Sequence, residues 1–243
     1  MGFSTGALAL ADFRLGSAML KDVSEVSAVE LSALRAHELT PLANALTSLD
    51  VRGFSYVAFH APSAFTRDEE RAVVDTLVGI AERGWPIVVH PDAIHDWTLW
   101  RSFEDLLCIE NMDKRKPIGR TVSELKACFD HAPEAQLCLD LGHARQVDPS
   151  MTVTFLLLRE FGDRLKQVHL SDVSTDSRHN RISYSAGLAF RKIAGLIPTA
   201  TPIILETPVT TEEIAKEIQR AREALTPSKP GQSSTSSIPA AYP

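Results

Sequence analysis

The runs SYVAFH at residues 55–60, PIVVH at 86–90 and LLCIE at 106–110 are short and mostly apolar, and each ends in histidine or glutamate. Continuous apolar runs of this length are typical of strands that are buried on both faces of a parallel sheet. Residues 67–83, between the first two runs, carry apolar side chains at the three- and four-residue spacing of an amphipathic helix. This part of the chain therefore predicts strands that alternate with helices, which is the α/β class.

The same alternation continues over most of the chain. Strands are predicted at residues 2–7, 27–31, 55–60, 86–90, 106–110, 136–140, 167–170 and 202–206, and helices at 13–21, 67–83, 122–131, 153–161 and 211–225. Eight strands are the number that closes a (β/α)8 barrel, the TIM barrel, and 243 residues suit one such domain. A doubly wound open sheet is the alternative, but it usually has a glycine-rich phosphate loop after an early strand, which this sequence lacks.

The end of the chain differs in composition. From Thr226 to Pro243 it is rich in proline, serine, glycine and glutamine and offers little to bury. Such a composition is typical of disordered segments. We therefore expect residues 1–225 to form the barrel domain and residues 226–243 to form a disordered tail.

Net charge and cysteine content bear on the partners and the cellular compartment of the protein. The formal net charge is −6, so no global basic field attracts nucleic acid or a membrane, although a local basic patch remains compatible. Cys108, Cys128 and Cys138 lack the paired spacing of a zinc knuckle and are expected to be buried, reduced thiols. The N-terminus has no signal pattern, and no stretch approaches the length of a membrane span. We expect a cytoplasmic protein without a membrane partner, and a homo-oligomer is compatible with the sequence.

The residues that end the strands point to chemistry. In a parallel barrel every strand has its C-terminal end at the same rim, so residues about one βα unit apart in sequence converge in space. Carboxylates gathered there repel one another unless a cation offsets their charge. Mixed imidazole and carboxylate ligands suit zinc, manganese, iron or cobalt better than magnesium or calcium. The sequence predicts a divalent-metal site, with zinc or manganese preferred, formed by His60, His90, Glu110, Asp140, His143, His169 and Glu206.

Three residues are candidates for contacts with a substrate. In DLGH at 140–143, we expect Gly142 to permit a tight turn after the strand, from which His143 binds either metal or substrate. Glu30 ends the second strand and is expected either to bind substrate hydroxyls or to form a salt bridge inside the rim. Arg178 is expected to hold a phosphate or carboxylate, or to be a solvated loop charge.

From residue 2 to about residue 225 the chain resembles the xylose isomerase-like barrel superfamily. This superfamily includes sugar-phosphate isomerases and epimerases and the endonuclease IV class of nucleases, also known as family 2 AP endonucleases. The similarity rests on the order and spacing of six segments, which are FHAP at 59–62, VVHP at 88–91, IEN at 109–111, CLDLGHA at 138–144, VHLSD at 168–172 and ILETP at 204–208.

The resemblance implies roles for individual residues. Both branches hold one metal with a quartet, which here is Glu110, Asp140, His169 and Glu206. The nuclease branch holds further metals with histidines that match His60, His90, His143 and His179. Where the nuclease pattern has an aspartate ligand this chain has Ser177, so that carboxylate is missing unless Asp176 replaces it. The resemblance therefore implies between one and three divalent ions.

Two activities follow from the resemblance. We favour a metal-dependent isomerase or epimerase of a sugar or sugar phosphate, in which Glu110 and Glu206 resemble residues that move a proton beside a metal-polarised carbonyl. The alternative is an endonuclease IV-like phosphodiesterase acting on abasic DNA, which His60, His90 and the LETP segment favour. Nucleic acid is a partner only in this second case, and the sequence shows no clear basic and aromatic cluster for it. A scaffold without activity is a third alternative, which the many intact ligand-type residues disfavour.

Overall fold

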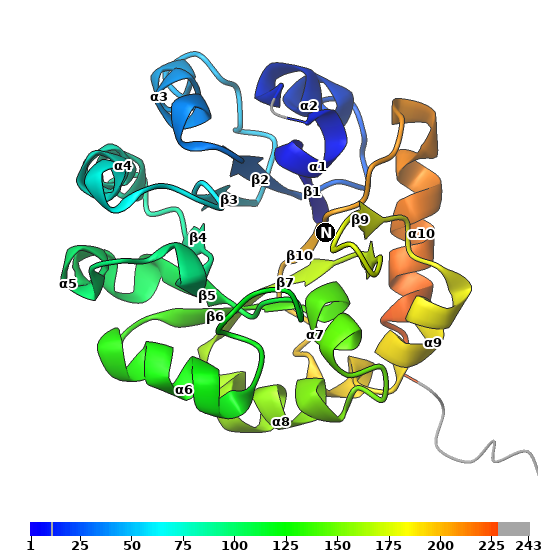
Figure 1. Cartoon of the computed structure of the whole chain (residues 1–243). Coiled ribbons are helices and arrows are strands. Elements are labelled where there is room, and N and C mark those ends of the chain that lie inside the picture. Colours follow the sequence, from blue (N-terminus) through cyan, green and yellow to red (C-terminus); the bar gives the residue numbers. More distant parts are fainter. Residues whose placement is uncertain (11, 228–243) are drawn as a thin grey trace, which may run out of the picture.

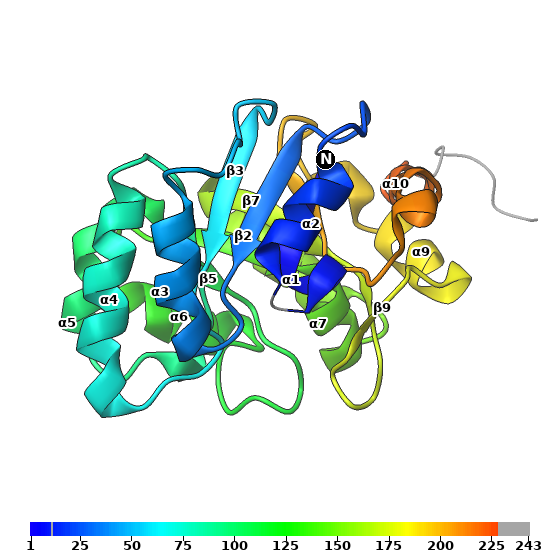
Figure 2. The same cartoon turned by 90° about the horizontal axis from the view of Figure 1, so that it is seen from above.

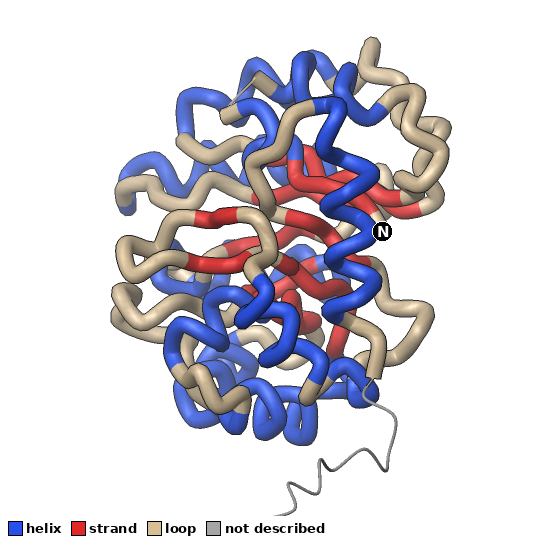
Figure 3. Tube along the Cα trace, turned by 90° about the vertical axis from the view of Figure 1, so that its right-hand side faces the viewer, coloured by secondary structure: helices blue, strands red, loops and turns tan. Residues whose placement is uncertain are grey.

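The computed structural model of the chain describes residues 1–10 and 12–227. Within these residues a closed barrel of eight parallel strands, in the order β1, β10, β7, β6, β5, β4, β3 and β2, is surrounded by helices (Figures 1 and 3). The strands are β1 (Gly2–Ser4), β2 (Ala28–Ser32), β3 (Tyr56–His60), β4 (Ile87–Val89), β5 (Leu107–Glu110), β6 (Gln136–Asp140), β7 (Leu165–Leu170) and β10 (Ile203–Leu205). The predicted (β/α)8 fold is confirmed.

The helices follow the strands around the barrel. They are α1 (Thr5–Ala9), α2 (Phe13–Leu20), α3 (Ala36–Ala45), α4 (Arg67–Ala81), α5 (Trp97–Trp100), α6 (Val122–His131), α7 (Leu141–Val147), α8 (Thr152–Phe161), α9 (Tyr184–Arg191) and α10 (Ile214–Ala224). Short 3-10 turns occur at Pro91–Ala93, Arg101–Leu106, Gly162–Arg164, Ala194–Leu196 and Thr211–Glu213. Every helix among the described residues is too short or too polar to span a bilayer. Residues 228–243 lie outside the described residues, so the disordered tail stays a prediction.

The first strand is shorter than the sequence predicted. Residues 2–7 were expected to be extended, but β1 ends at Ser4 and α1 begins at Thr5. The Thr5 hydroxyl is buried and accepts a hydrogen bond from the backbone N–H of Ser32. This contact with β2 replaces the strand pairing that a longer β1 would have made, so the chain turns into a helix directly after the rim.

Two apolar regions stabilise the barrel. The larger lies between the sheet and the helices, and its largest buried side chains include Trp100, Phe3, Phe59 and Phe190. A separate small cluster consists of Val88, Cys108 and Cys138. Each of these three precedes a candidate ligand by two positions, so it points to the same face of its strand as that ligand. On the side of β4, β5 and β6, the barrel interior is therefore apolar below the candidate site. All three cysteines are buried and free, as the sequence predicted.

Gly142 has a different role from the expected one. It lies inside α7 rather than in a turn, and the side chain of Asp140 caps this helix by accepting from the N–H of His143 at 2.7 Å. A Cβ atom at residue 142 would lie 2.6 Å from Val173 Cγ2 and 2.8 Å from the carbonyl oxygen of Ser171. Glycine is needed here because α7 packs directly on the segment after β7.

A buried glutamate fixes the chain beyond β4. Glu70 in α4 is 1% exposed, and its Oε1 accepts from the backbone N–H groups of His95 and Asp96 and from the indole N–H of Trp100. Three donors satisfy this carboxylate without an opposite charge. These bonds hold residues 95–100, which follow His90, against α4.

Candidate metal centre

The ends of six strands bring their polar side chains together at one mouth of the barrel. His60, Glu110 and Asp140 are the last residues of β3, β5 and β6, while His90 and Glu206 directly follow β4 and β10. His169 is the penultimate residue of β7. Glu110, Asp140 and His169 are at most 1% exposed, and Glu206 is 9% exposed. The predicted convergence therefore occurs, and it occurs in a buried setting.

Among the described residues, these side chains form overlapping groups whose potential ligand atoms lie within 4.8 Å of one another. One group is the predicted quartet, a second joins Glu110 to two histidines and a third joins Asp140 to two histidines. The groups made of histidines and carboxylates alone are Glu110, Asp140, His169 and Glu206; His60, His90 and Glu110; and Asp140, His143 and His179. Glu110 and Asp140 each belong to two of these groups, so the groups are continuous.

Glu110 lies at the centre of the arrangement, and its two oxygens face different partners. Oε2 is 3.2 Å from His60 Nε2 and 3.4 Å from His90 Nε2. Oε1 is 3.2 Å from His143 Nδ1 and 3.6 Å from His169 Nδ1. A carboxylate in this position has the geometry of a bridge between two cation sites.

Asn111 is a site residue to which the sequence assigned no role. Its side-chain amide donates to the carbonyl oxygen of Asp140 at 2.9 Å, and its Oδ1 accepts from the N–H of Asp140 at 2.7 Å. Its own carbonyl oxygen lies 3.1 Å from His143 Nδ1. The two-sided bond clamps β5 to β6 where both carry ligands. The IEN segment was the available signal, because it places a polar amide directly after a strand-end glutamate.

Glu30 lies deeper in the barrel than the ligand groups. Its side chain is fully buried, and its Oε2 accepts from His169 Nε2 at 2.9 Å and from the Gln167 amide at 2.7 Å. The hydroxyl of Tyr56 in turn donates to Gln167 Oε1 at 2.6 Å. Of the two roles expected for Glu30, burial favours the ion pair inside the barrel over contact with a substrate.

The segment after β7 carries the remaining candidates. It forms a small antiparallel pair, β8 (Asp172–Val173) with β9 (His179–Asn180). His179 Nδ1 lies 2.8 Å from the Ser171 hydroxyl and 3.6 Å from Glu206 Oε2. Asp176 is exposed and belongs to none of the ligand groups found among the described residues, so it does not replace the missing carboxylate. Arg178 is also exposed.

Ser177 forms a hydrogen bond to a carboxylate of the loop that follows β5. Its hydroxyl donates to Asp113 Oδ1 at 2.7 Å, and Asp113 is 4% exposed. Burial opposes ionisation of Asp113, but the hydrogen bonds and charges around it, the Ser177 bond among them, lower its pKa. Asp113 belongs to none of the ligand groups among the described residues, so it supports the hairpin rather than the metal site.

Electrostatics keep the two glutamates ionised. Burial alone would raise the pKa of Glu110, but the positive charges of His169 and His90 in their protonated forms, and the close approach of His143, lower it well below the usual value. The pKa of Glu206 is lowered in the same way, against burial, chiefly by the charges of His169 and His179. Cys138 is close to Glu110 and His169, but burial raises its pKa well above the usual value and keeps it a thiol.

The donor set fits divalent metal ions. Buried side-chain atoms without a hydrogen-bond partner include Asp140 Oδ2, His169 Nδ1 and Glu206 Oε2, which all belong to the quartet. Unpaired buried polar atoms are destabilising unless a ligand satisfies them. Imidazole nitrogens mixed with carboxylate oxygens are donors that suit zinc or manganese.

Metal binding is expected to release protons. In the metal-free protein burial opposes charge on His60 and His143, but neighbouring carboxylates raise their pKa values to about 9 and about 10. Burial raises the pKa of Asp140 to about 8. These groups therefore hold protons at pH 7, and a proton must leave a nitrogen or oxygen before it binds metal. We expect zinc affinity to rise about tenfold per pH unit or more between pH 6 and 8.

Calorimetric titration with zinc in two buffers of different ionisation enthalpy measures this release. The same titration on protein already saturated with zinc is the control and should show none. Equal heats in both buffers, with an affinity that does not change with pH, would contradict the expectation.

Solved structures share this architecture. Endonuclease IV from Thermus thermophilus matches with a TM-score of 0.59 at 20% identity, over 92% of this chain and 98% of that one. A protein assigned as a sugar phosphate isomerase/epimerase from Anabaena variabilis matches with a TM-score of 0.56 at 13% identity, over 90% and 86%. The 3-keto-D-glucoside 4-epimerase of E. coli matches with a TM-score of 0.51 at 12% identity, over 86% and 92%.

No protein-family model matches the chain, and no curated protein matches it significantly. The structural likeness shows that the chain has the xylose isomerase-like TIM barrel fold that its sequence predicted. Since nucleases and epimerases both occur among these structures, the choice of activity depends on the side chains.

Proposed function

We propose that this chain is a divalent-metal-dependent phosphodiesterase of the endonuclease IV type, with DNA at abasic sites as its substrate. The observation that carries this proposal is the overlap of three ligand groups through Glu110 and Asp140. The sequence patterns favoured an isomerase, and the geometry leads us to prefer the alternative.

The four histidines outside the quartet decide between the two activities. The quartet by itself could hold a metal ion that polarises a substrate carbonyl, which is what an isomerase or epimerase requires. The ligands of that one ion do not include His60, His90, His143 or His179, although His60 and His143 are only 4% exposed. Several metal ions acting on a phosphodiester would use all four. Close divalent ions, when bound, activate a water and offset the charge that develops around phosphorus.

The chain's own contribution is to hold these groups in place. Glu110 presents one oxygen to each pair of histidines, and Asn111 fixes the backbone of Asp140. Burial lowers the pKa of His90 and of His179, which favours the neutral ring that has a lone pair for a metal ion. The group of Asp140, His143 and His179 lacks the aspartate that the nuclease pattern has at position 177, where this chain has serine. We therefore expect this group to bind its ion more weakly than the other two.

The isomerase remains the second candidate, because the quartet is complete by itself. In that function Glu110 or Glu206 would move a proton beside the substrate carbonyl. Glu206 is the more exposed of the two, at 9% against 1%, and is therefore the better placed to reach a substrate.

A direct assay tests the proposal. Full-length protein loaded with zinc or manganese is given a labelled duplex with one abasic site, and in parallel a panel of ketoses and sugar phosphates in deuterated water. We expect strand cleavage at the abasic site that a chelator stops and that His90→Ala lowers by about 10²-fold or more. The matched control is His37→Ala, because His37 lies exposed on α3. Deuterium incorporation into a sugar, lost in Glu206→Gln and without any DNA cleavage, would overturn the proposal in favour of the isomerase.

A further inference from the structure

Two segments project beyond the ends of the strands on the side of the candidate metal centre (Figure 2). One is the loop 113–120 after β5, drawn in green, and the other is the hairpin segment 172–181 that contains β8 and β9, drawn in yellow-green. Together they carry six lysine or arginine residues and three aspartates, in a chain whose net charge is −6. Positive charge is therefore concentrated at this mouth of the barrel.

The two segments are joined into one surface. The Ser177 hydroxyl donates to Asp113, and the Arg115 guanidinium donates to the carbonyl oxygen of Asp176. Gln146 in α7 links both from below, because its amide donates to the carbonyl oxygen of Ser174 at 2.6 Å and its Oε1 accepts from the N–H of Lys114 at 3.1 Å. The relative position of the cations is thus fixed by bonds between segments that are far apart in sequence.

Half of the six cations are already neutralised. Lys116 pairs with Asp92 at 2.8 Å, Arg120 with Glu124 at 2.8 Å and Arg181 with Glu213 at 2.5 Å. Lys114, Arg115 and Arg178 are the other three, and in the part of the chain that the structure describes none of them has a carboxylate within ion-pair distance. We call these three residues the cationic rim.

The cationic rim adjoins the candidate metal centre. Arg178 directly precedes His179, whose Nδ1 lies 3.6 Å from Glu206 Oε2. Lys114 and Arg115 follow Glu110 closely in the chain. Asp113, which lies between Glu110 and Lys114 in sequence, bonds to Ser177 of the hairpin. A ligand held by these cations would pass beside the metal groups.

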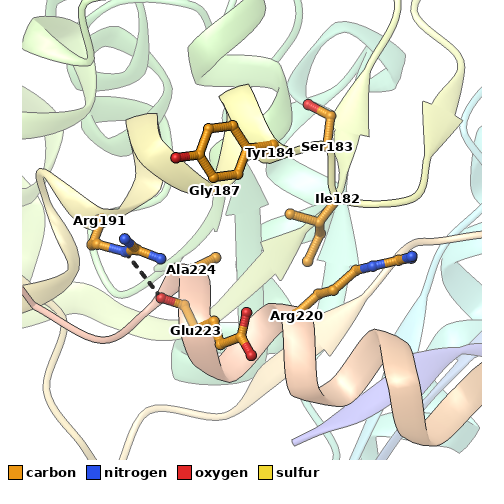
Figure 4. A pocket seen from close by; sticks show the side chains of 8 residues that line it. All are labelled: Ile182, Ser183, Tyr184, Gly187, Arg191, Arg220, Glu223 and Ala224. Carbon is orange, nitrogen blue, oxygen red and sulfur yellow. Dashed lines mark hydrogen bonds between the residues drawn. The ribbon is translucent and has the colours of Figure 1, made fainter.

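A second cationic feature elsewhere differs from the cationic rim. A depression of about 230 Å³ between α9 and α10 is lined by Ile182, Ser183, Tyr184, Gly187, Arg191, Arg220, Glu223 and Ala224 (Figure 4). Of its two arginines, Arg220 pairs with the carboxylate of Glu217 at 2.7 Å, whereas Arg191 donates to the carbonyl oxygen of Glu223 at 3.2 Å. This depression therefore has one arginine without a carboxylate partner, against three such cations in the cationic rim, and Glu223 in its lining would repel an anion.

We propose that the cationic rim binds the phosphate backbone of a nucleic acid and holds the strand across the mouth of the barrel. The proposal rests on the proposed phosphodiesterase function for its ligand class, because a neutral sugar would gain nothing from three unpaired cations and a sugar phosphate has only one phosphate group to offer them, whereas a nucleic acid has one at each nucleotide. Along the sequence no basic cluster was evident, since the members come from two segments that only the fold brings together.

Binding without catalysis tests this surface. Anisotropy of a labelled abasic duplex is measured with full-length protein in excess chelator, so that no cleavage occurs. The double variant Lys114→Glu/Arg178→Glu is expected to bind at least about tenfold more weakly at ~0.1 M salt, and to lower the slope of log affinity against log salt by about 2. The matched control, Arg159→Glu/Lys216→Glu, makes the same charge change at exposed positions of α8 and α10 and should bind like the wild type. Arg115 is spared because it links the two segments.

The outcomes separate the two proposals. Loss of duplex binding in the double variant, together with an unchanged zinc content, supports the rim whether or not the wild type cleaves DNA. If the wild type then binds DNA but never cleaves it, the proposed hydrolysis fails and the rim stands. Equal affinity of the double variant and the wild type, or no measurable affinity of the wild type, overturns the rim.

Discussion

Glu110→Gln is expected to lower the rate of cleavage of an abasic duplex by on the order of 10³-fold and to remove more than one metal ion per molecule. The two carboxylate oxygens face two pairs of histidines, at 3.2 to 3.4 Å on one side and 3.2 to 3.6 Å on the other. An amide is neutral and offers one oxygen, so it cannot serve cations on both sides. The loss of several kcal/mol of charge stabilisation gives a rate effect of this size.

Metal content after desalting and kcat/KM on the abasic duplex are the two measurements for this variant. Glu134→Gln, at an exposed position before β6, is the matched control and should behave like the wild type. A Glu110→Gln protein that keeps its full metal content and cleaves within about tenfold of the wild type would show that Glu110 does not bridge. Loss of a single ion would indicate that only the quartet binds metal.

The position of the candidate site could be predicted from the sequence because barrel topology determines where the end of each strand lies. Once eight parallel strands are recognised, the residue that ends each strand must lie at one rim, whatever the loops do. His60, Glu110 and Asp140 were found in this way. Their order along the chain was sufficient, because neighbouring strands are a fixed distance apart.

The grouping within the site could not be predicted in the same way. Which oxygen of Glu110 faces which histidine depends on rotamers, and these depend on packing that periodicity does not encode. For the same reason the sequence could not distinguish a one-metal quartet from three overlapping groups, and it favoured the isomerase. The cationic rim was missed because Lys114 and Arg178 are far apart in sequence and are brought together by tertiary bonds such as those of Gln146 to both segments.

Two local predictions were wrong for a shared reason. The first strand was expected to continue to residue 7, and Gly142 was expected in a turn, yet both positions are helical. At each place a tertiary contact outweighs the local pattern, since Thr5 bonds to β2 and residue 142 packs against Ser171 and Val173. Short segments at strand ends have too few residues for periodicity to compete with such contacts.

Glu30→Gln is expected to weaken zinc binding by about 10- to 100-fold without lowering the thermal stability of the metal-free protein. Glu30 Oε2 accepts from His169 Nε2 at 2.9 Å, which leaves His169 Nδ1 free to face Glu110 and Glu206. A carboxylate behind a ligand histidine fixes its tautomer and increases its basicity, and loss of such a partner has an effect of this size on metal affinity. Glu30 Oε1 has no hydrogen-bond partner in the buried interior, so removal of this desolvated charge offsets the loss of the ion pair with His169.

This pair of effects distinguishes a positioning role from a purely structural one. A group that only packs the core would lower affinity and stability together, whereas a group that orients His169 lowers affinity alone. Three measurements test this. Zinc competition with a chromophoric chelator gives the affinity, and thermal unfolding of the metal-free protein gives the stability. The nitrogen NMR shifts of the His169 ring report its tautomer. Tyr56→Phe is the matched control, because it removes the bond to Gln167 but leaves the Glu30–His169 contact intact. If Glu30→Gln binds zinc as tightly as Tyr56→Phe does, or if both variants lose stability equally, Glu30 does not act through His169.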